Sequence, residues 1–465
     1  MPGKLLLKGA LTVVFALGMV ACGGDDGGGS SDPGYFRFVN LSANSPTIEL
    51  EMDENSYSKR DFGESSSLAS MDADTYELSF NQLLPNTEDD QFVSDSDITV
   101  SQNEILTYIV YGDVNSIEKL TITTYVEDIF DDDYDLDLGR LQFVHLAPEL
   151  GDVDIYLVDA GDDLLNQSSE LFLSYGDVSD AADFDIGDYK IIVTAANSQT
   201  ILLESDNIDI DYGESYIYCL VEVESVTSDQ PHYSLVELDE GASRVYANDA
   251  EPAHIRFNNA IADIDAVDIY LDAVTGEEAN LVFAGVEFGD ISGEARIDIK
   301  DVDRGDSHEL YITAAGSTET LESFDIDVDT DSQMLITAAG LIYGTSSERV
   351  RLNTVSEDLR AIDTHAKLIF THAIGQERDD SLEFLVVEHG DDPDSFSPQI
   401  TIGYLSSKEY EIERGDYDVY VYNADTGSLL LERELNGLDK GDVINLTATE
   451  AEGGSTPYQL KEVEN

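Results

Sequence analysis

One stretch of the chain predicts the fold. Residues 141–157 read LQFVHLAPELGDVDIYL, which is two short apolar runs separated by a turn. The second run, residues 153–157, places its apolar side chains at every other position. That spacing is typical of a β-strand with one face on a core and the other towards water. The stretch therefore predicts two half-buried strands.

The same landmarks recur four times, so the body of the chain is predicted to be four copies of one unit. A phenylalanine anchors each copy, and the anchors lie 105, 114 and 113 residues apart. The first copy diverges most, and the fourth carries two extra residues in its first loop. The openings are Phe36–Asn40, Leu141–His145, Ile255–Asn259 and Leu368–His372; the second strands are Ile48–Met52, Val153–Leu157, Val267–Leu271 and Leu382–Val386; and a large apolar residue precedes Gly63, Gly176, Gly289 and Gly403.

The repeated unit has the pattern of a β-sandwich. In the first copy Ile48, Leu50 and Met52 share one strand face, and carboxylates occupy the other. No run after Cys22 has the period of a helix, and units of about 100 residues with several short strands are typical of sandwiches. A transmembrane barrel also alternates, but its outward face is apolar and bounded by aromatic girdles, whereas carboxylates stand here. We therefore predict an all-β protein of four tandem immunoglobulin-like β-sandwich domains.

A recurrent tyrosine supports this prediction. Tyr189 and Tyr417 follow an acid-x-Gly-x-Tyr spacing, and Tyr76 follows a looser version of it. The third copy ends the same pattern in His308. Immunoglobulin-like domains use such a tyrosine to tie a corner to upstream backbone through its hydroxyl. We expect a structural role for the three tyrosines rather than a binding site, and we expect the rings of Tyr189 and Tyr417 to be largely buried.

The unit resembles the DUF4397 family, an extracytoplasmic domain of unknown function found in bacterial secreted proteins and lipoproteins. The likeness rests on Phe143–Pro148 followed by Val153–Tyr156, and on Arg256–Ala260 followed by Val267–Tyr270. The first and fourth copies are less similar. The resemblance covers nearly the whole mature chain, and it implies a fold and a compartment but no reaction.

The N-terminus is typical of a bacterial lipoprotein. A short basic region precedes an apolar run, residues 10–21, that is too short to span a bilayer and fits a secretory signal. The run ends in Met19-Val20-Ala21-Cys22, which resembles a lipobox in which Cys22 is lipidated and becomes the first residue; the alternative is an ordinary signal peptide with an incidental cysteine. Gly23 favours the outer membrane by resemblance to the sorting rule of two-membrane bacteria. Cys219, then the only free thiol, lies in a strand-like run and is expected to be buried and inert.

These landmarks divide the chain into six parts. The polar segments Glu127–Gly139, Asn248–Pro252 and Glu357–Asp363 are expected to be exposed linkers that a protease cuts first. The parts are a lipoprotein signal peptide (1–21), a flexible Gly/Ser/Asp tether (22–34) and β-sandwich repeats at 35–130, 140–247, 253–357 and 364–465.

The charge excludes one class of partner. The sequence holds 98 acidic residues against 23 Lys and Arg, for a formal net charge of −75. A nucleic-acid binder needs a basic surface and is excluded. An acidic surface attracts cations, so we expect weak, non-specific binding of divalent ions. We expect no cofactor. The clusters Asp131–Asp137 and Asp325–Asp331 are interpreted as solvated surface, since the first lacks the glycine and glutamate of an EF-hand.

No pattern predicts a catalytic or metal site. His145 and His372 occupy one repeat position, where the other copies carry Asn40 and Asn259. Both residue types offer a hydrogen-bond donor and acceptor, so a structural role is expected. The remaining histidines show no metal-ligand spacing; they are His232, His254, His308, His365 and His389.

Two functions follow. The favoured one is a non-enzymatic, lipid-anchored protein of the cell envelope, attached to the outer membrane by its acyl chain, whose modules bind protein or glycan or act as a spacer. Repetition supports it, because copies multiply binding surface or reach. The alternative is an extracellular hydrolase acting on glycans through paired carboxylates. Two acids converging in a cleft of one repeat only would favour the alternative.

Overall fold

The computed structural model describes residues 32–85, 91–125, 138–162, 169–223, 231–239, 243–272, 279–297, 307–451 and 455–464, together with 164, 167, 225 and 226. The predicted signal peptide, Cys22, most of the tether and the acidic cluster Asp131–Asp137 lie outside these residues. Within them, no helix is long and apolar enough to cross a membrane.

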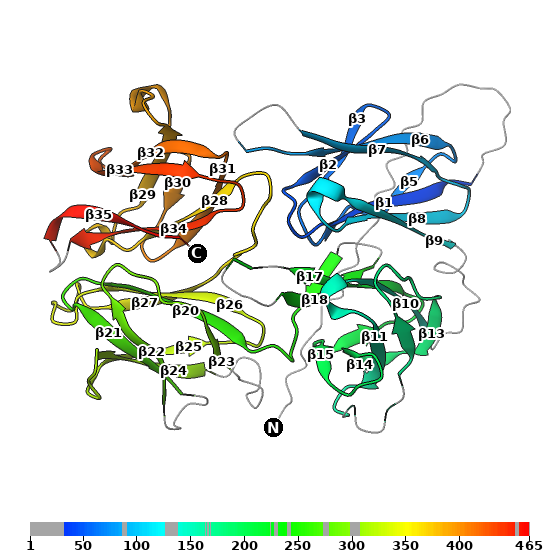
Figure 1. Ribbon diagram of the computed structural model, residues 1–465, viewed down its shortest axis with the longest axis horizontal. Helices are drawn as coiled ribbons and strands as arrows, with labels where there is room; N and C mark the ends of the chain where they lie inside the picture. Colours follow the sequence, from blue (N-terminus) through cyan, green and yellow to red (C-terminus); the bar gives the residue numbers. More distant parts are fainter. Residues whose placement is uncertain are drawn as a thin grey trace, which may run out of the picture.

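The fold is all-β, as predicted, and consists of four immunoglobulin-like sandwiches of two sheets each (Figure 1). The first repeat packs sheet β4-β1-β8-β9, with β5 also on β1, against sheet β3-β2-β6-β7. Its elements are β1 (Gly34–Leu41), β2 (Ile48–Met52), β3 (Asn55–Arg60), β4 (Glu64–Ser65), β5 (Ala69–Met71), β6 (Thr75–Gln82), β7 (Gln91–Thr99), β8 (Glu104–Tyr111), the 3-10 helix η1 (Val114–Ser116) and β9 (Glu118–Tyr125).

The second repeat packs sheet β13-β10-β17-β18-β19 against sheet β12-β11-β14-β15, with β16 also on β14. Its elements are β10 (Leu138–Leu146), η2 (Pro148–Leu150), β11 (Val153–Asp159), β12 (Leu171–Leu173), β13 (Ala182–Asp185), β14 (Gly187–Ala195), β15 (Ile201–Glu204), β16 (Ile208–Ile210), β17 (Ser215–Val223), β18 (His232–Leu238) and β19 (Ser243–Tyr246).

The third repeat packs sheet β23-β20-β26-β27 against β22-β21-β24-β25, and the fourth packs β31-β28-β34-β35 against β30-β29-β32-β33. The third comprises β20 (Ala253–Ile261), β21 (Ala266–Leu271), β22 (Asn280–Glu287), β23 (Ala295–Ile297), β24 (Ser307–Ala314), β25 (Thr320–Asp327), β26 (Gln333–Gly340) and β27 (Arg351–Ser356). The fourth comprises β28 (Ala366–His372), η3 (Gly375–Glu377), β29 (Leu382–Glu388), η4 (Pro393–Ser395), β30 (Ile400–Ile402), β31 (Ser407–Ile412), β32 (Gly415–Asn423), β33 (Leu429–Leu438), β34 (Val443–Ala451) and β35 (Ser455–Glu464).

Each opening strand runs parallel to a later strand of its own repeat: β1 with β8, β10 with β17, β20 with β26 and β28 with β34. The phenylalanine anchors on these strands are at most 2% exposed. In β20 and β28 every residue is buried, which a strand with one face in water cannot achieve. The outward faces of β20 and β28 are therefore covered by another part of the molecule.

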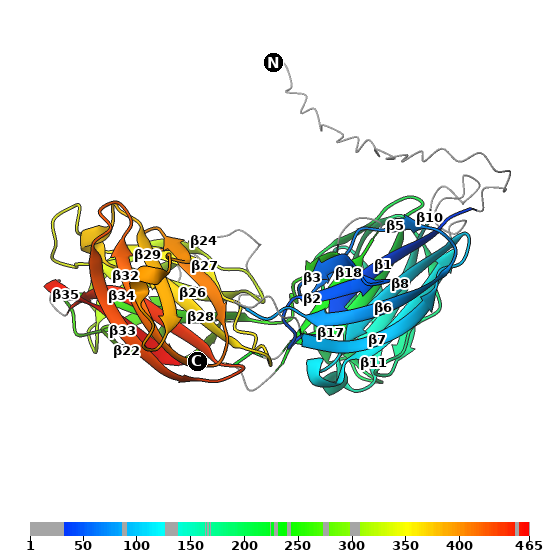
Figure 2. The same ribbon diagram turned by 90° about the horizontal axis from the view of Figure 1, so that it is seen from above.

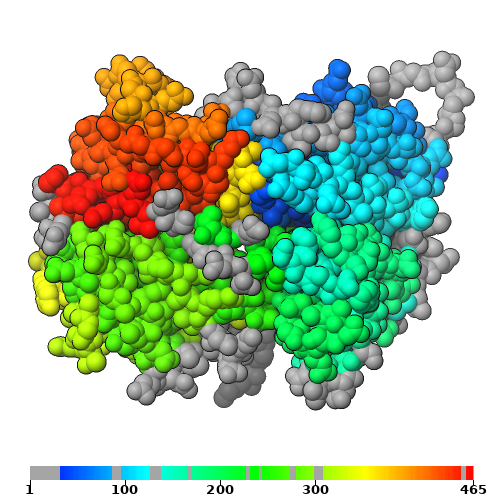
Figure 3. Space-filling model, viewed as in Figure 1, coloured from blue at the N-terminus to red at the C-terminus, as the bar shows by residue number. Residues whose placement is uncertain are grey.

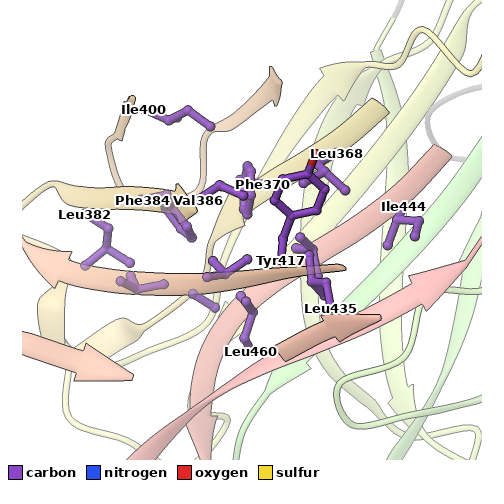
Figure 4. Close-up of a cluster of buried hydrophobic side chains, with 14 of the residues drawn as sticks. Leu368, Phe370, Leu382, Phe384, Val386, Ile400, Tyr417, Leu435, Ile444 and Leu460 are labelled. Atoms are coloured by element: carbon purple, nitrogen blue, oxygen red, sulfur yellow. The ribbon is translucent and has the colours of Figure 1, made fainter. Parts of the chain in front are cut away.

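Every repeat has its own hydrophobic core between its two sheets. Figure 4 shows that of the fourth repeat, where Phe370 and Phe384 meet with ring centroids 4.8 Å apart and Tyr417 joins them. Full burial of one such side chain contributes about 1.5–3 kcal/mol. The four cores make each sandwich a packing unit.

The sandwiches are paired into two lobes, which Figure 2 shows separated by a narrow waist and Figure 3 shows as adjoining blocks. In the first lobe the outward faces of the first two repeats share an apolar cluster that includes Val39, Ile109, Val144 and Ile217. In the second lobe the third and fourth repeats meet through small residues such as Ala339 and through polar contacts.

The segment between the third and fourth repeats joins the lobes. Asp363 Oδ2 accepts hydrogen bonds from Asn44 Nδ2 at 3.0 Å and from Asn115 Nδ2 at 2.9 Å. Leu359 is 2% exposed, and so is not a solvated linker residue; Asn248, in the segment before the third repeat, is 0% exposed. The expectation that both segments are exposed is therefore wrong, because the compact arrangement buries polar linker residues against neighbouring repeats.

Candidate functional site

The four strand-end positions share one hydrogen-bond pattern. At each, the side chain accepts from the backbone amide two residues later, through Oδ1 of Asn40 and Asn259 at 3.1 Å and through Nδ1 of His145 and His372 at 3.3 Å. Three of the four groups also donate to a backbone carbonyl: His145 Nε2 to Gly151 O at 2.6 Å, Asn40 Nδ2 to Arg60 O at 3.1 Å and Asn259 Nδ2 to Val286 O at 2.9 Å. Nε2 of His372 has no hydrogen-bond partner among the described residues. Imidazole and carboxamide thus both supply the acceptor that the backbone amide requires, which accounts for their interchange.

This pattern requires neutral histidines. Burial lowers the pKa of His145, and it lowers the pKa of His372 to about 4. A protonated ring would lose the Nδ1 acceptor that the backbone amide uses. The geometry is that of a structural cap at a strand end.

The three corner tyrosines differ in their hydroxyls. Tyr189 Oη donates to Asp185 O at 3.0 Å, and Tyr76 Oη donates to Asp72 O at 2.9 Å. Both rings are only partly buried. Tyr417 is 8% exposed, and its hydroxyl has no hydrogen bond to the part of the chain that the structure describes. Tyr189 and Tyr76 therefore have the expected hydroxyl–backbone hydrogen bond, but their rings are not fully buried. Tyr417 has a buried ring but lacks that hydrogen bond.

The glycine of the acid-x-Gly-x-Tyr spacing makes room for the ring. A Cβ on Gly415 would lie 3.2 Å from Cε2 of Tyr417, and a Cβ on Gly187 would lie 3.4 Å from Cε2 of Tyr189. The spacing thus reflects a ring folded back over the chain two residues earlier.

Cys219 lies in the apolar contact between the first two repeats and is 0% exposed. Burial raises the pKa of its thiol to about 12, so the reactive thiolate does not form at neutral pH. The expectation that Cys219 is buried is confirmed, and its lack of reactivity stays a prediction.

Acids converge in a cleft of about 500 Å³ where the fourth repeat and the preceding segment meet the first repeat. Burial raises the pKa of Glu409, whereas the hydrogen bond with His365 lowers the pKa of Glu411. Burial also opposes ionisation of Asp358, but Lys367, at 2.7 Å, outweighs it and lowers that pKa. A carboxyl with a raised pKa beside carboxyls with lowered pKa values resembles an acid–base pair, yet Asp358 is paired with Lys367 and Glu411 lies 3.4 Å from His365.

An uncharged row of side chains crosses the outer face of sheet β22-β21-β24-β25. Leu281, Tyr270, Tyr311 and Ser323 lie directly opposite one another on four neighbouring strands. We call this row the tyrosine band. Leu281 is 50% exposed, and both tyrosines are half-buried. With neighbouring strands about 4.8 Å apart, the band extends roughly 15 Å across the sheet.

A shallow pocket adjoins the tyrosine band. It has a volume of about 230 Å³ and none of its described lining residues is charged. Hydroxyl groups dominate the wall beside the two rings, which is the composition of a site for a ligand with both apolar faces and hydroxyls. The lining residues are Tyr270, Ala279, Tyr311, Thr313, Thr318 and Thr320.

Two carboxylates on the same strands flank the tyrosine band and are engaged in hydrogen bonds. Asp268 accepts the backbone amides of Gly285 and Gly316, one on each oxygen, at 2.7 Å. Glu309 Oε2 accepts the hydroxyl of Tyr311 at 2.7 Å, and this bond raises the pKa of Tyr311 to about 12. The hydroxyl of Tyr311 is thus neutral, and it is held by Glu309.

The band distinguishes the third repeat. At the two central positions, Tyr270 and Tyr311, the other repeats carry different pairs on adjacent strands. In the second repeat Leu164 packs on that pair, and in the fourth Leu385 is 2% exposed. The equivalent pairs are Glu51 with Ser79, Tyr156 with Ile192, and Leu385 with Tyr420.

Sequence reasoning did not single out the band, although a signal was present. Val267, Ile269 and Leu271 alternate towards the core, so Tyr270 falls on the polar face of its strand. A tyrosine there, between two aspartates, is an aromatic residue on the face that otherwise carries charge. Its partner Tyr311 could not be inferred, because the register of β21 with β24 is a tertiary property.

The fold defines the protein as a tandem array of immunoglobulin-like sandwiches, and part of it matches a known family. Residues 34–156 match the family model of DUF4397, a domain of unknown function, so the resemblance is confirmed for this part of the chain. The match covers the first repeat and the opening strands of the second, although the first repeat diverges most in its landmarks.

The other comparisons add little. No curated protein matches the chain. Among solved structures, the Bacillus anthracis TIE protein aligns with 90% of this chain and 69% of its own, at 10% identity and a TM-score of 0.15. Similarity at that level carries no argument about function.

Proposed function

We propose that this protein is a non-enzymatic, lipid-anchored protein of the cell envelope that binds a neutral glycan on the tyrosine band of its third repeat. The observation that carries the proposal is an uncharged aromatic row, with a hydroxyl-lined pocket beside it, on a molecule with a formal net charge of −75. Apolar and aromatic groups gathered on an acidic surface are typical of a site that binds a partner or a ligand.

Sugar chemistry suits this row. One face of a pyranose ring presents C–H groups that pack on an aromatic ring, and its rim presents hydroxyls that exchange hydrogen bonds with Ser323, Thr318 and Thr320. An acidic glycan would be repelled by the surrounding carboxylates, so the ligand is a neutral glycan. The compact pairing of the repeats favours a binding platform over a spacer, because paired modules extend less far than four modules in line (Figure 2).

Anchoring follows from the N-terminal sequence. Met19–Cys22 and the Gly/Ser tether place Cys22 as the acylated residue, and the outer membrane is the proposed destination. Cys22→Ser should leave a protein without acyl mass that no longer partitions with detergent. A mature wild-type chain that begins at another residue would refute the anchor while leaving the glycan proposal untouched.

Affinity electrophoresis tests the binding function. Native gels containing soluble neutral polysaccharides (dextran, pullulan, galactomannan) or an acidic one (alginate) are run with wild-type protein and variants. We expect retardation by a neutral polysaccharide, loss of retardation in Tyr270→Ala and Tyr311→Ala, and wild-type behaviour in the matched control Tyr420→Ala. Retardation by alginate alone, or equal retardation of the Tyr311→Ala and wild-type proteins, would refute the proposal.

The second candidate function is the carboxylate-dependent hydrolase, and the raised pKa of Glu409 is the observation that favours it. In that case Glu409 would act as the general acid in the cleft with Glu411 or Asp358. Release of reducing ends from the retained polysaccharide, abolished by Glu409→Gln, would support this function. Intact polysaccharide after prolonged incubation supports the binding protein.

A further inference from the structure

Three neighbouring strands of the fourth repeat bring together a histidine and two acids on the outer face of sheet β30-β29-β32-β33. His389 directly follows β29, Asp418 lies on β32 and Glu434 lies on β33. One nitrogen of His389 and one oxygen from each carboxylate all lie within 4.8 Å of one another. Residues far apart along the chain thus form one compact donor set, which explains why the sequence showed no ligand spacing.

Asp418 is the centre of this set and is held in a fixed orientation. Its Oδ2 accepts the backbone amide of Gly390 at 3.2 Å, and its Oδ1 lies 3.0 Å from His389 Nδ1. Its side chain is 14% exposed, against 51% for His389, so the set opens to solvent on the histidine side. Hydrogen bonds that orient a carboxylate in this way are typical around metal ligands.

Comparison with the other repeats shows which member is special. In the first and third repeats the equivalent strand positions also hold two acids opposite each other, Glu77 with Asp97 and Glu309 with Asp325. In the second repeat Lys190 stands at the place of Asp418 and forms an ion pair with Glu204 at 2.9 Å. An acid pair is therefore a recurrent surface feature, and among the described residues only the fourth repeat adds an imidazole to it.

We propose that His389, Asp418 and Glu434 form a binding site for a divalent transition-metal ion of the zinc type, with water completing the coordination. A mixed set of one imidazole and two carboxylates suits zinc, whereas calcium requires six to eight oxygen ligands. Because like charges directly opposite on adjacent strands repel each other, a bound cation would also relieve the repulsion between Asp418 and Glu434.

The test measures zinc binding by isothermal titration calorimetry on the full, metal-stripped protein in about 1 M NaCl, where screening over about 3 Å suppresses diffuse attraction by the acidic surface. We expect one saturable equivalent, with an affinity reduced at least about tenfold in His389→Ala and in Glu434→Gln. The matched control Glu77→Gln/Asp97→Asn removes an acid pair without a histidine and should bind as the wild type does.

His389 and Glu434 are exposed, so the variants should keep the wild-type unfolding midpoint, which is measured in parallel. The proposal is overturned by the absence of a saturable equivalent at high salt, by His389→Ala binding zinc as tightly as the wild type, or by equimolar calcium displacing the zinc. Failure of the glycan experiments would leave this result unaffected, because the site lies on another repeat.

Discussion

The two lobes are built from the same repeat but are held together by different chemistry. In the first lobe the outward faces of β1, β8, β10 and β17 meet through apolar side chains such as Val39, Ile109 and Ile217. In the second lobe the equivalent face of the third repeat buries Arg256 and Asn258, which are 3% and 0% exposed. Asn258 Nδ2 donates across the contact to Thr447 Oγ1 at 2.9 Å.

The difference shows how one fold can carry two kinds of contact. Apolar burial contributes about 25 cal/mol per Å² and tolerates small shifts, so it favours association without fixing register closely. Buried polar groups add little net stability, and they cost several kcal/mol when a partner is lost. The first lobe should therefore respond to changes in volume, and the second to the loss of single polar groups and to pH.

The largest effect is expected in the second lobe. Arg256 Nε lies 3.5 Å from Glu357 Oε2, and both side chains are almost fully buried. Above pH 7, where Glu357 is ionised in the wild type, Arg256→Met leaves that carboxylate without its cation and should reduce the free energy of unfolding by about 3–5 kcal/mol in urea denaturation. The double variant Arg256→Met/Glu357→Leu should recover most of the loss, and an Arg256→Met protein as stable as the wild type would remove the contrast between the lobes.

A volume change should be felt in the first lobe. Ile109 is 0% exposed, and Ile109→Ala should cost about 3 kcal/mol, with faster labelling of Cys219 in a Cys22→Ser background. Ile201, which is 36% exposed, supplies the control, since Ile201→Ala should change neither quantity appreciably. Unaltered labelling of Cys219 in the Ile109→Ala protein would show that this contact does not control opening of the first lobe.

The second lobe should also respond to pH in two opposite directions. Burial raises the pKa of Glu357 to about 7. Its contribution to the free energy of unfolding is therefore present at low pH and is lost as the pH rises from about 4.5 to 7. Burial lowers the pKa of His372 to about 4, so its contribution is present above about 6.5 and is lost as pH falls towards 4. Each shift corresponds to roughly 3 kcal/mol.

Two variants separate these contributions in urea denaturation across that range. Relative to the wild type, Glu357→Gln should lose less stability as pH rises, and His372→Asn should lose less as pH falls. Asparagine is the residue that the first and third repeats carry at the position of His372, so the fold should accept it. Parallel pH profiles for wild type and both variants would contradict the assigned shifts.

The smallest effect concerns the corner tyrosines, one in each lobe. Tyr189→Phe removes the hydroxyl that bonds Asp185 O and should cost about 1 kcal/mol. Tyr417→Phe removes a hydroxyl with no such bond within the described residues and should cost close to nothing. Equal losses in thermal or urea unfolding would show that the bond is not the source of the difference.

Much of the fold could be predicted from the sequence because it depends on local periodicity. Alternation in Ile48–Met52 and Val153–Leu157 is a property of single strands, and the interchange of His145 with Asn40 indicated a hydrogen-bonding role. The lobes could not be predicted in this way. The alternation of its strand predicts that Arg256 faces solvent. The same pattern arises when that strand face packs on a neighbouring repeat, so the sequence does not tell the two environments apart.

The two candidate sites could not be predicted from the sequence, for a related reason. Tyr270 and Tyr311 come together through the register of β21 and β24, and His389, Asp418 and Glu434 through the register of three strands. Strand register and the order of strands in a sheet depend on the packed sandwich as a whole. Only one member of each set is recognisable in the sequence: Tyr270, an aromatic residue on the polar face of its strand, and His389, a histidine on such a face.

Glycan binding by the tyrosine band is tested by the affinity of the full protein for the neutral polysaccharide that retards it, measured calorimetrically at about 0.1 M and about 1 M NaCl. A neutral ligand packed on aromatic rings involves no ion pairing, so we expect the same affinity at both salt concentrations for the wild type and for Tyr420→Ala. We expect no measurable binding for Tyr311→Ala. An affinity that falls steeply with salt, or a Tyr311→Ala protein that binds as the wild type does, would show that the band does not bind a neutral glycan.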